Sequence, residues 1–209
     1  MYWIPASSGL RESCHKGKLK YISIEGDLQM KTPILETERL ILRPLCADDA
    51  EDVFQNWTSD ADVARFMRWE VHKSVVETRQ WLLSDEALID SDEVYNWGFV
   101  LKLTGELIGS GGLVFQKTKG MYELGYCIMK KYWNQGITTE AASEIIDFGK
   151  NVLKQTEFYC CHAKENPASG SVMRKVGFQY QCDGFYDTWN QKKRFLCSEY
   201  LLSINGSLL

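Results

Sequence analysis

The stretch YWNQGITTEAASEIIDFGK, residues 132–150, joins a glycine-containing turn to an amphipathic helix. The apolar positions of that helix share one face: Ile137, Ala141, Ala142, Ile145, Ile146, Phe148, Val152 and Leu153. This spacing predicts a helix that packs one side on a core. The first N–H groups of a helix have no intrahelical partner and can hold an anion, so Gly136, Thr138 and Thr139 form a candidate anion site. The alternative interpretation is an ordinary loop that leads into a helix.

The composition of the chain is that of an ordinary globular protein. Of its 209 residues, 44% are hydrophobic and 25% are charged, and this length suits one domain with a good-sized core. The net charge of −4 and the lack of a long basic run argue against a nucleic-acid binder. No segment has the ~18 consecutive apolar residues that cross a bilayer. The N-terminal segment also lacks the apolar core of a secretory signal, so we expect a cytoplasmic protein with no membrane segment.

The first 29 residues differ in pattern from the rest of the chain. They are mixed in polarity and show no sustained periodicity, whereas the alternation sharpens after Met30. We therefore expect residues 1–29 to be a poorly ordered extension, or a start upstream of the true one. We expect residues 30–209 to form a single domain.

The cysteine and histidine pattern indicates neither a metal site nor a disulfide framework. The seven cysteines are an odd number without a C-x-x-C pair: Cys14, Cys46, Cys127, Cys160, Cys161, Cys182 and Cys197. Reduced, buried thiols are the better interpretation. Cys160 and Cys161 are neighbours in a predicted strand, so they point to opposite faces and could not easily share one ion with His162. The other histidines, His15 and His72, show no metal-ligand spacing either.

Strand and helix patterns follow one another in an order typical of an α+β protein. Strands are expected at residues 39–45, 96–103, 106–116, 121–129, 158–163, 179–185 and 193–202. Helices are expected at residues 47–57, 74–91, 137–154 and 169–177. Ser74 is a candidate cap for the second helix, with Glu77 three residues later. Short turns join the three central strands into an antiparallel meander. We expect an α+β fold, an α/β/α sandwich around one mixed sheet.

Two segments carry a resemblance to a known family. ELGYCIMKKYWNQGITTEAASEIIDFG (residues 123–149) and ENPASGSVMRKVGFQ (residues 165–179) resemble the GNAT superfamily of acetyl-CoA-dependent N-acetyltransferases. LETERLILRPL, DVARFMRW and GELIGSGGL are similar to the branch that contains the Rim-type ribosomal-protein N-terminal acetyltransferases. The resemblance covers residues 35–202. It implies the GNAT fold, a mixed and mostly antiparallel sheet with a splayed central strand pair. It also implies acetyl-CoA as cosubstrate, with no metal.

The resemblance also implies which residues hold acetyl-CoA. The pyrophosphate loop of the family, Q/R-x-x-G-x-G/A, falls on Trp133, Asn134, Gln135, Gly136, Ile137 and Thr138. Trp133 stands where the family has a basic or amide side chain. Thr138 adds bulk, or a hydroxyl donor, where the diphosphate approaches, and Thr139 supplies another hydroxyl. Three backbone positions match those that pair with pantetheine, as a splayed strand can accept an amide-bearing arm: Cys127, Ile128 and Met129.

The second motif, NPAS, implies two more site residues. In the family the asparagine at Asn166 contacts the CoA arm, and in the Rim-type branch the serine at Ser169 lies near the thioester sulfur. Many members carry a tyrosine four residues later that acts as general acid, but this chain has Met173 there. Ser169, or a water that it holds, is then the candidate that protonates the departing thiolate. A helix N-cap is the structural interpretation of Ser169, and both roles can hold together.

Glu123 is the candidate general base. Acetyl transfer requires loss of a proton from an ammonium group with an unperturbed pKa of about 10, and a nearby carboxylate can remove it directly or through water. The alternative is a solvated strand charge beside the KTKG hairpin. Glu140, in the first helical turn, mainly complements the helix dipole. Phe66, Trp69 and Trp97 could line an acceptor pocket, although aromatic residues at such spacing are more often core.

These residues together indicate an N-acetyltransferase that moves acetyl from acetyl-CoA to a primary amine by direct attack. A strand N–H near Ile128 would stabilise the tetrahedral oxyanion. A protein N-terminus is one candidate acceptor, and a small-molecule amine such as a polyamine or an aminoglycoside is the alternative. A CoA-binding module that has lost catalysis is the alternative from another class, suggested by Met173 and Thr138. We expect a monomer or a homodimer with no nucleic-acid or membrane partner.

Overall fold

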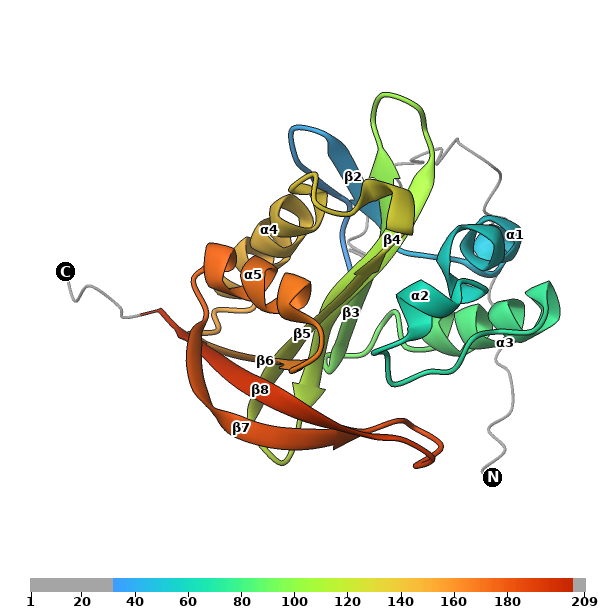
Figure 1. Cartoon of the computed structure of the whole chain (residues 1–209). Coiled ribbons are helices and arrows are strands. Elements are labelled where there is room, and N and C mark those ends of the chain that lie inside the picture. Colours follow the sequence, from blue (N-terminus) through green and yellow to red (C-terminus); the bar gives the residue numbers. More distant parts are fainter. Residues whose placement is uncertain (1–31, 205–209) are drawn as a thin grey trace, which may run out of the picture.

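The structure, a computed structural model, describes residues 32–204, and these build one eight-stranded sheet (Figure 1). The strands are β1 (Leu35–Glu36), β2 (Leu40–Arg43), β3 (Val94–Leu101), β4 (Leu107–Gln116), β5 (Met121–Ile128), β6 (Glu157–Ala163), β7 (Gln179–Asp187) and β8 (Arg194–Ser203). Their order in the sheet is β1-β2-β3-β4-β5-β6-β8-β7. Every neighbouring pair is antiparallel except β5 and β6, which are parallel. The expected mixed sheet with a central meander is confirmed, and the expectation for residues 1–29 lies outside the described residues.

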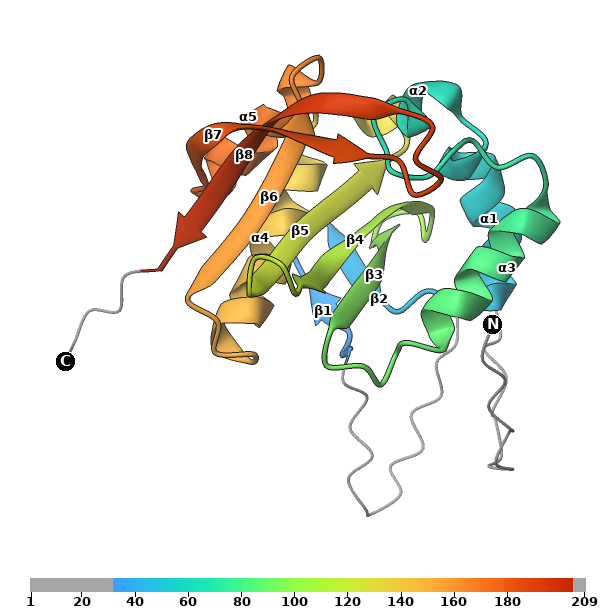
Figure 2. The same cartoon turned by 90° about the horizontal axis from the view of Figure 1, so that it is seen from below.

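Helices cover both faces of this sheet (Figure 1). They are η1 (Ala47–Asp49), α1 (Ala50–Val53), η2 (Phe54–Thr58), α2 (Ala61–Ala64), α3 (Val75–Glu86), η3 (Lys130–Tyr132), α4 (Ile137–Asn151) and α5 (Pro167–Val176). Helices α4 and α5 pack on one face, whereas α1, α2 and α3 lie on the other (Figures 1 and 2). The predicted α/β/α sandwich is therefore correct.

The amphipathic pattern of α4 correctly predicted most of the main core. Ile137, Ile145 and Phe148 are buried against the central strands. Val152 was wrongly assigned to that stripe, because the helix ends at Asn151 and Val152 is 61% exposed. The remaining predicted core positions that are buried are Ala141, Ala142 and Ile146.

The predicted helix at residues 47–57 is instead three short segments, 3₁₀, α and π. The Asp49 carboxylate accepts hydrogen bonds from the Cys46 N–H and from both terminal nitrogens of Arg43, which fixes the first turn. At the other end, the Ser59 hydroxyl donates to the Phe54 carbonyl, 2.6 Å away, and the Ser59 N–H donates to the same carbonyl. Side chains that bond back to a carbonyl five residues earlier widen the helix, and a periodicity count does not show such bonds.

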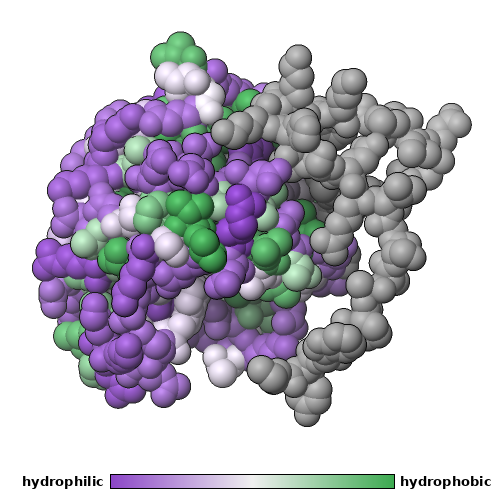
Figure 3. Space-filling view, turned by 90° about the vertical axis from the view of Figure 1, so that its right-hand side faces the viewer, coloured by the Kyte–Doolittle hydropathy of each residue, from purple (hydrophilic) through white to green (hydrophobic). Residues whose placement is uncertain are grey.

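Helix α3 begins where the sequence predicts but ends five residues earlier than expected. The Ser74 hydroxyl accepts the Glu77 N–H as a cap, 3.3 Å apart. The Glu77 carboxylate accepts from the Lys73 N–H and not from the Ser74 N–H, so a standard capping box does not form. The face on the side of α1 and α3 is mainly hydrophilic with separate hydrophobic spots (Figure 3). Within residues 32–204, no helix has the length and apolarity that a membrane span requires.

Strands β5 and β6 are paired only at their beginnings. Their register joins Tyr122 to Phe158 and Glu123 to Tyr159, and no further pair is formed. Beyond Glu123 the two strands run in the same direction but separate (Figure 2). Strand β5 stays paired with β4 as far as Ile128, and β6 stays paired with β8. The expected splayed central pair is therefore present.

The tip of the β7–β8 hairpin returns to the segment after α2, on the face opposite α4 (Figure 2). The Tyr186 hydroxyl donates to the Phe66 carbonyl, 2.7 Å away, and the Trp189 N–H donates to the Arg68 carbonyl at 2.8 Å. Phe66 packs edge-on against Phe195. These contacts close a wall around the face of β5 that carries Glu123.

Gly149 of α4 tests how tightly this helix packs. A Cβ at this position would lie 2.6 Å from the buried Phe158 ring. We expect Gly149→Ala to lower the free energy of unfolding by about 1–2 kcal/mol, since the clash exceeds the gain in helix propensity. Urea denaturation measures it. Gly125→Ala, with no atom within 4 Å of its Cβ, is the control and should change stability by less than about 0.5 kcal/mol. Equal effects of the two substitutions would contradict the packing argument.

Candidate active site

The separation of β5 from β6 leaves backbone groups of β5 without a strand partner. The Met129 N–H donates to the Ile108 carbonyl, so alternation along the antiparallel ladder turns the Cys127 N–H toward β4 and the Ile128 N–H toward the gap. The Met129 carbonyl accepts from the Tyr132 N–H. These backbone groups of Cys127 and Met129 are engaged within the protein, and their contact with pantetheine stays a prediction. Ile128 is the position of the three that faces the gap.

The loop after β5 presents its N–H groups at the start of α4. Gly136 has a φ of +75° and is the N-cap, and no side chain caps the helix there. Asn134 is also left-handed, with a φ of 61°. Left-handed residues in a turn make successive N–H groups converge on a concave site for an anion. The N–H groups of Ile137, Thr138 and Thr139 add the free donors and the positive end of the helix dipole.

Trp133 and Arg39 hold this loop from two sides. The Trp133 indole N–H donates to the Ile128 carbonyl, 3.0 Å away, so this side chain closes over the end of β5. The Arg39 guanidinium donates to the Gln135 carbonyl at 3.0 Å and lies beside Gly136. The Arg39 guanidinium, from the turn between β1 and β2, therefore places a positive charge beside this loop. Trp133 has no charge to supply there.

Glu140 turns away from the loop toward the β1–β2 turn. Its carboxylate accepts hydrogen bonds from the Thr37 hydroxyl, from the Arg39 N–H and from the Arg39 Nε, the last at 2.6 Å. Burial opposes ionisation, but these hydrogen bonds and the Arg39 charge hold the pKa of Glu140 below its ordinary value. The expected dipole role is thus supplemented by a structural one, which joins α4 to β2 and leaves the anion site clear of this carboxylate.

At the start of α5 the structure changes the interpretation of Ser169. The N-cap is Asn166, whose side-chain oxygen accepts the Ser169 N–H at 3.4 Å, and Pro167 occupies the first helical position. Ser169 therefore lies inside the first turn and is not the cap. Met173 is 2% exposed and packs into the main core. The side chain at position 173 is therefore part of the core.

Tyr126 is a site residue that the sequence analysis missed. It projects from β5 toward α5, and its hydroxyl lies 3.0 Å from the Ser169 hydroxyl oxygen and 3.0 Å from the Ser169 carbonyl oxygen. Burial raises the pKa of Tyr126 far above its ordinary value, in spite of the hydrogen bond to Ser169, so this phenol stays neutral. The GYC sequence gave no signal, because the contact joins residues 43 positions apart.

Glu123 faces the opposite side of the sheet and is not a solvated strand charge. Its side chain is 15% exposed. One carboxylate oxygen accepts from the Gln116 amide at 2.7 Å, and the other lies 3.4 Å from the Arg68 guanidinium and 3.7 Å from the Cys161 sulfur. The Arg68 guanidinium also stacks over Tyr186, 4.8 Å from the ring centre. Arg68 is a second neighbour that sequence reasoning missed.

The cysteines near Glu123 are not candidate nucleophiles. Burial and the neighbouring Glu123 charge raise the pKa of Cys161 to about 12, so it stays a thiol near neutral pH. Cys160 points to the α4 side, is buried in the core, and has its pKa raised by burial. Across residues 32–204 the structure shows no disulfide and no cluster of three His, Cys, Asp or Glu side chains that could hold a metal.

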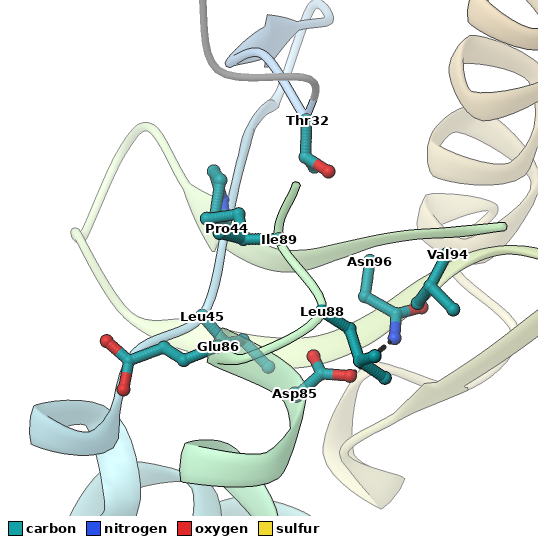
Figure 4. A pocket seen from close by; sticks show the side chains of 9 residues that line it. All are labelled: Thr32, Pro44, Leu45, Asp85, Glu86, Leu88, Ile89, Val94 and Asn96. Carbon is teal, nitrogen blue, oxygen red and sulfur yellow. Dashed lines mark hydrogen bonds between the residues drawn. The ribbon is translucent and has the colours of Figure 1, made fainter. Parts of the chain in front are cut away.

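Two hollows lie near the sheet. One is lined by Asp85 and Asn96, which share a hydrogen bond of 2.8 Å (Figure 4). At about 10 Å³ it has room for no more than a water molecule. The other, about 230 Å³, opens beside Tyr159 on the face that carries Glu123. There the Lys119 ammonium lies 4.0 Å from the centre of the Tyr159 ring and 2.9 Å from the Glu199 carboxylate.

Of the three aromatic residues considered for an acceptor pocket, two pack away from Glu123 and one lies near it. Trp97 is fully buried and donates its indole N–H to the Pro33 carbonyl, so it belongs to the core. Trp69 packs on His72, whose Nδ1 pairs with the Thr78 hydroxyl at 2.8 Å. Phe66 lies in the wall near Glu123 and is the candidate of the three that remains beside the site.

Comparison with known proteins identifies the class of protein that this fold and site define. The family model described as "Acetyltransferase (GNAT) domain" matches residues 39–179. The chain is 32% identical over 149 residues to the uncharacterized N-acetyltransferase YoaA of Bacillus subtilis (strain 168), covering 70% of this chain and 83% of YoaA. The chain belongs to the GNAT family and is an N-acetyltransferase.

Solved structures of ribosomal-protein acetyltransferases share this fold. The ribosomal-protein-S5-alanine acetyltransferase of Vibrio fischeri matches with a TM-score of 0.70 at 16% identity, over 83% of this chain and 98% of its own. RimL, a ribosomal L7/L12 alpha-N-protein acetyltransferase solved in complex with coenzyme A, matches with a TM-score of 0.69 at 16% identity, over 82% and 98%. At such identities the likeness concerns the fold alone.

The Glu140 contacts predict a pH-dependent contribution to stability. Because the folded pKa lies below the ordinary value of 4.5, the contribution is present above that pH and is lost as the pH falls through the folded pKa. We expect Glu140→Gln to lower the free energy of unfolding by about 1 kcal/mol at pH 7. The deficit should shrink below about pH 4. Glu36→Gln, which removes an exposed pair with Lys102, is the control and should have little effect. A deficit that does not change with pH would contradict this assignment.

Proposed function

We propose that this protein transfers the acetyl group of acetyl-CoA to a primary amine, with a protein N-terminus as the preferred acceptor class. The observation that carries the proposal is the gap between β5 and β6, with Glu123 on one face of the sheet and Tyr126 with Ser169 on the other. Acetyl-CoA would bring its thioester into this gap. The amine would approach from the Glu123 side, and the thiol would leave on the α5 side.

The residues around the gap fit the cofactor arm in chemical type. The Gly136 turn offers converging N–H groups and a helix N-terminus to the diphosphate. The Ile128 N–H faces the gap, where it can pair with an amide of the arm or stabilise the oxyanion of the tetrahedral intermediate. Thr138 and Thr139 are partly exposed in the first turn of α4, so their hydroxyls can reach a phosphate.

Glu123 is proposed to prepare the amine for attack. A primary ammonium with a pKa of about 10 is almost fully protonated at neutral pH, so the reaction needs a base. Gln116 and Arg68 both contact the carboxylate, so Glu123 stays in place on the acceptor face. Direct attack of the amine suits this site better than a covalent enzyme intermediate, because Cys161 beside Glu123 stays protonated.

A small-molecule amine is the second candidate acceptor. The hollow of about 230 Å³ near Tyr159 supports it, since the Lys119 ammonium already lies there between an aromatic ring and the Glu199 carboxylate. A coupled thiol-release assay separates the two candidates: it compares peptides with free N-termini against polyamines and aminoglycosides. A clear preference for the small amines would overturn the proposed acceptor class, and the lack of thiol release with all of them would overturn catalysis.

The turn at Gly136 gives a direct test of CoA binding. A β-branched residue is strained at a φ of +75°, so Gly136→Val should rearrange the N–H groups of the turn. We expect the Kd for CoA to rise at least about tenfold, which is about 1.4 kcal/mol. Calorimetric titration measures it. Gly120→Val is the matched control, because Gly120 has a φ of +68° in a hairpin with open space around it. The same Kd for CoA in Gly136→Val and in wild type would show that this turn is not part of the CoA site.

The role of Glu123 is tested by the pH dependence of the rate. We expect Glu123→Gln to lower kcat roughly a hundredfold near neutral pH, as for loss of a general base. The deficit should shrink as the pH rises, because more of the acceptor is then free amine. The Kd for CoA and the melting temperature serve as controls and should stay close to wild type. A deficit that is constant across the pH range would assign Glu123 to positioning rather than to proton removal.

A further inference from the structure

The hydroxyl groups of Tyr126 and Ser169 form a pair at the edge of the gap between β5 and β6. Their oxygens are 3.0 Å apart, and the Tyr126 oxygen is also 3.0 Å from the Ser169 carbonyl oxygen. A phenol has one proton to donate, and a serine hydroxyl has one proton and two lone pairs. Two arrangements bond the two hydroxyls to each other, and they differ in where the Ser169 proton points.

In the first arrangement Tyr126 donates to the Ser169 carbonyl, and Ser169 donates to the Tyr126 oxygen. Both protons are then used inside the pair, and Ser169 has none for a ligand. In the second arrangement Tyr126 donates to the Ser169 hydroxyl oxygen. The Ser169 proton is then available to a group in the gap, and the bond from Tyr126 strengthens it as a donor.

We propose that Tyr126 is the positioning residue that directs the Ser169 hydroxyl toward the sulfur of the departing CoA. This inference rests on the proposed function, and it adds a residue that no motif of the sequence indicated. The neutral amine nitrogen forms the N–C bond and loses its extra proton to water, and the C–S bond breaks with its electron pair on sulfur. The Ser169 hydroxyl then donates a hydrogen bond to the thiolate. Tyr126 and Ser169 both keep their protons, and the released thiolate takes its proton from water.

The surroundings of Tyr126 suit a donor that never ionises. Its ring is packed beside the main core, which restricts the direction of its hydroxyl. Burial disfavours the charged phenolate, so Tyr126 keeps its proton across the working pH range. Met173 is enclosed in the core and has no hydroxyl, so it cannot donate a hydrogen bond to the thiolate.

The test measures the pKa of the thiol of bound CoA, which needs no acceptor amine. A hydrogen bond to the thiolate should lower this pKa below that of a free thiol, about 8.5. Thiolate absorbance of CoA bound to saturating protein, followed against pH, reports it. We expect a lowering of about one unit in wild type, and its loss in both Tyr126→Phe and Ser169→Ala. The double variant should lose no more than either single one, because the two hydroxyls act as a unit.

Two variants separate positioning from structural support. Tyr122→Phe is the matched control: Tyr122 lies on the same strand and face and donates to the Asp92 carbonyl at 2.6 Å, so the pKa of the bound thiol should stay as in wild type. Ser169→Thr keeps the hydroxyl and should retain the lowered pKa. If any variant unfolds, its melting temperature shows it, and Ser169→Thr against Ser169→Ala still tests the donor.

The outcomes distinguish this inference from the proposed function. If wild type does not bind CoA, both are overturned. If CoA binds and the thiol pKa is the same in wild type and folded Tyr126→Phe, Tyr126 only joins α5 to β5, and the proposed function stands. With a reactive amine, Tyr126→Phe should also lower kcat about tenfold while the KM for acetyl-CoA is unchanged. A rise in KM with normal kcat would overturn the positioning role.

Discussion

Parallel hydrogen bonding between β5 and β6 stops after Glu123, and the arrangement of the site follows from this break. Strand β5 stays bound to β4 along its length, and β6 stays bound to β8, so each strand follows its own half of the sheet. The halves share one short joint, and beyond it the twist of the sheet carries them apart. The Ile128 N–H at the edge of the gap needs a partner, because an unpaired buried backbone group is costly. An amide-bearing arm would supply one.

The main core packs side chains of both halves together, and several polar contacts near the gap belong to the candidate site. Tyr126 of β5 bonds to Ser169 of α5 on one face. On the other face Arg68 bonds to Glu123, and Tyr186 returns to the segment after α2. Each of these contacts therefore does two things: it sets the width of the gap, and it orients a group that faces it. Changes in these residues should be judged by both stability and turnover, since loss of either explains a loss of activity.

The sequence was sufficient for the parts of the fold that depend on local pattern. The stripe on α4, the central meander and the turn before Gly136 were predicted from spacing and from glycine alone, and the structure has them. The directions in which the Cys127 and Met129 backbone groups point were not predictable, because they depend on the phase of the β4–β5 ladder, which no side chain reveals. The prediction that Val152 belongs to the buried stripe was wrong for a related reason. The spacing of apolar residues continues in the sequence after the helix has ended.

The neighbours of the site were missed because each is distant in sequence. Tyr126 meets Ser169 across 43 positions, Arg68 meets Glu123 across 55, and Arg39 meets Gln135 across 96. Tertiary pairing alone brings them together. The motifs identify the groups that would touch acetyl-CoA, whereas the residues that hold those groups in place come from elements with no motif of their own.

The alternation of side chains along β5 explains how one strand serves both halves of the proposed reaction. Residues an odd number apart point to opposite faces, so Glu123 and Tyr126, three apart, lie on opposite sides of the sheet. Glu123 shares its face with the Arg68 cation and the Gln116 amide, which suit a charged carboxylate. Tyr126 lies on the apolar α4–α5 face, where only a neutral phenol is favourable. In the proposed reaction the gap joins the two faces, so a base and a neutral hydrogen-bond donor would act on one thioester without pairing with each other. On the same face, a base and a donor this close along the strand would bond to one another and leave neither for the substrate.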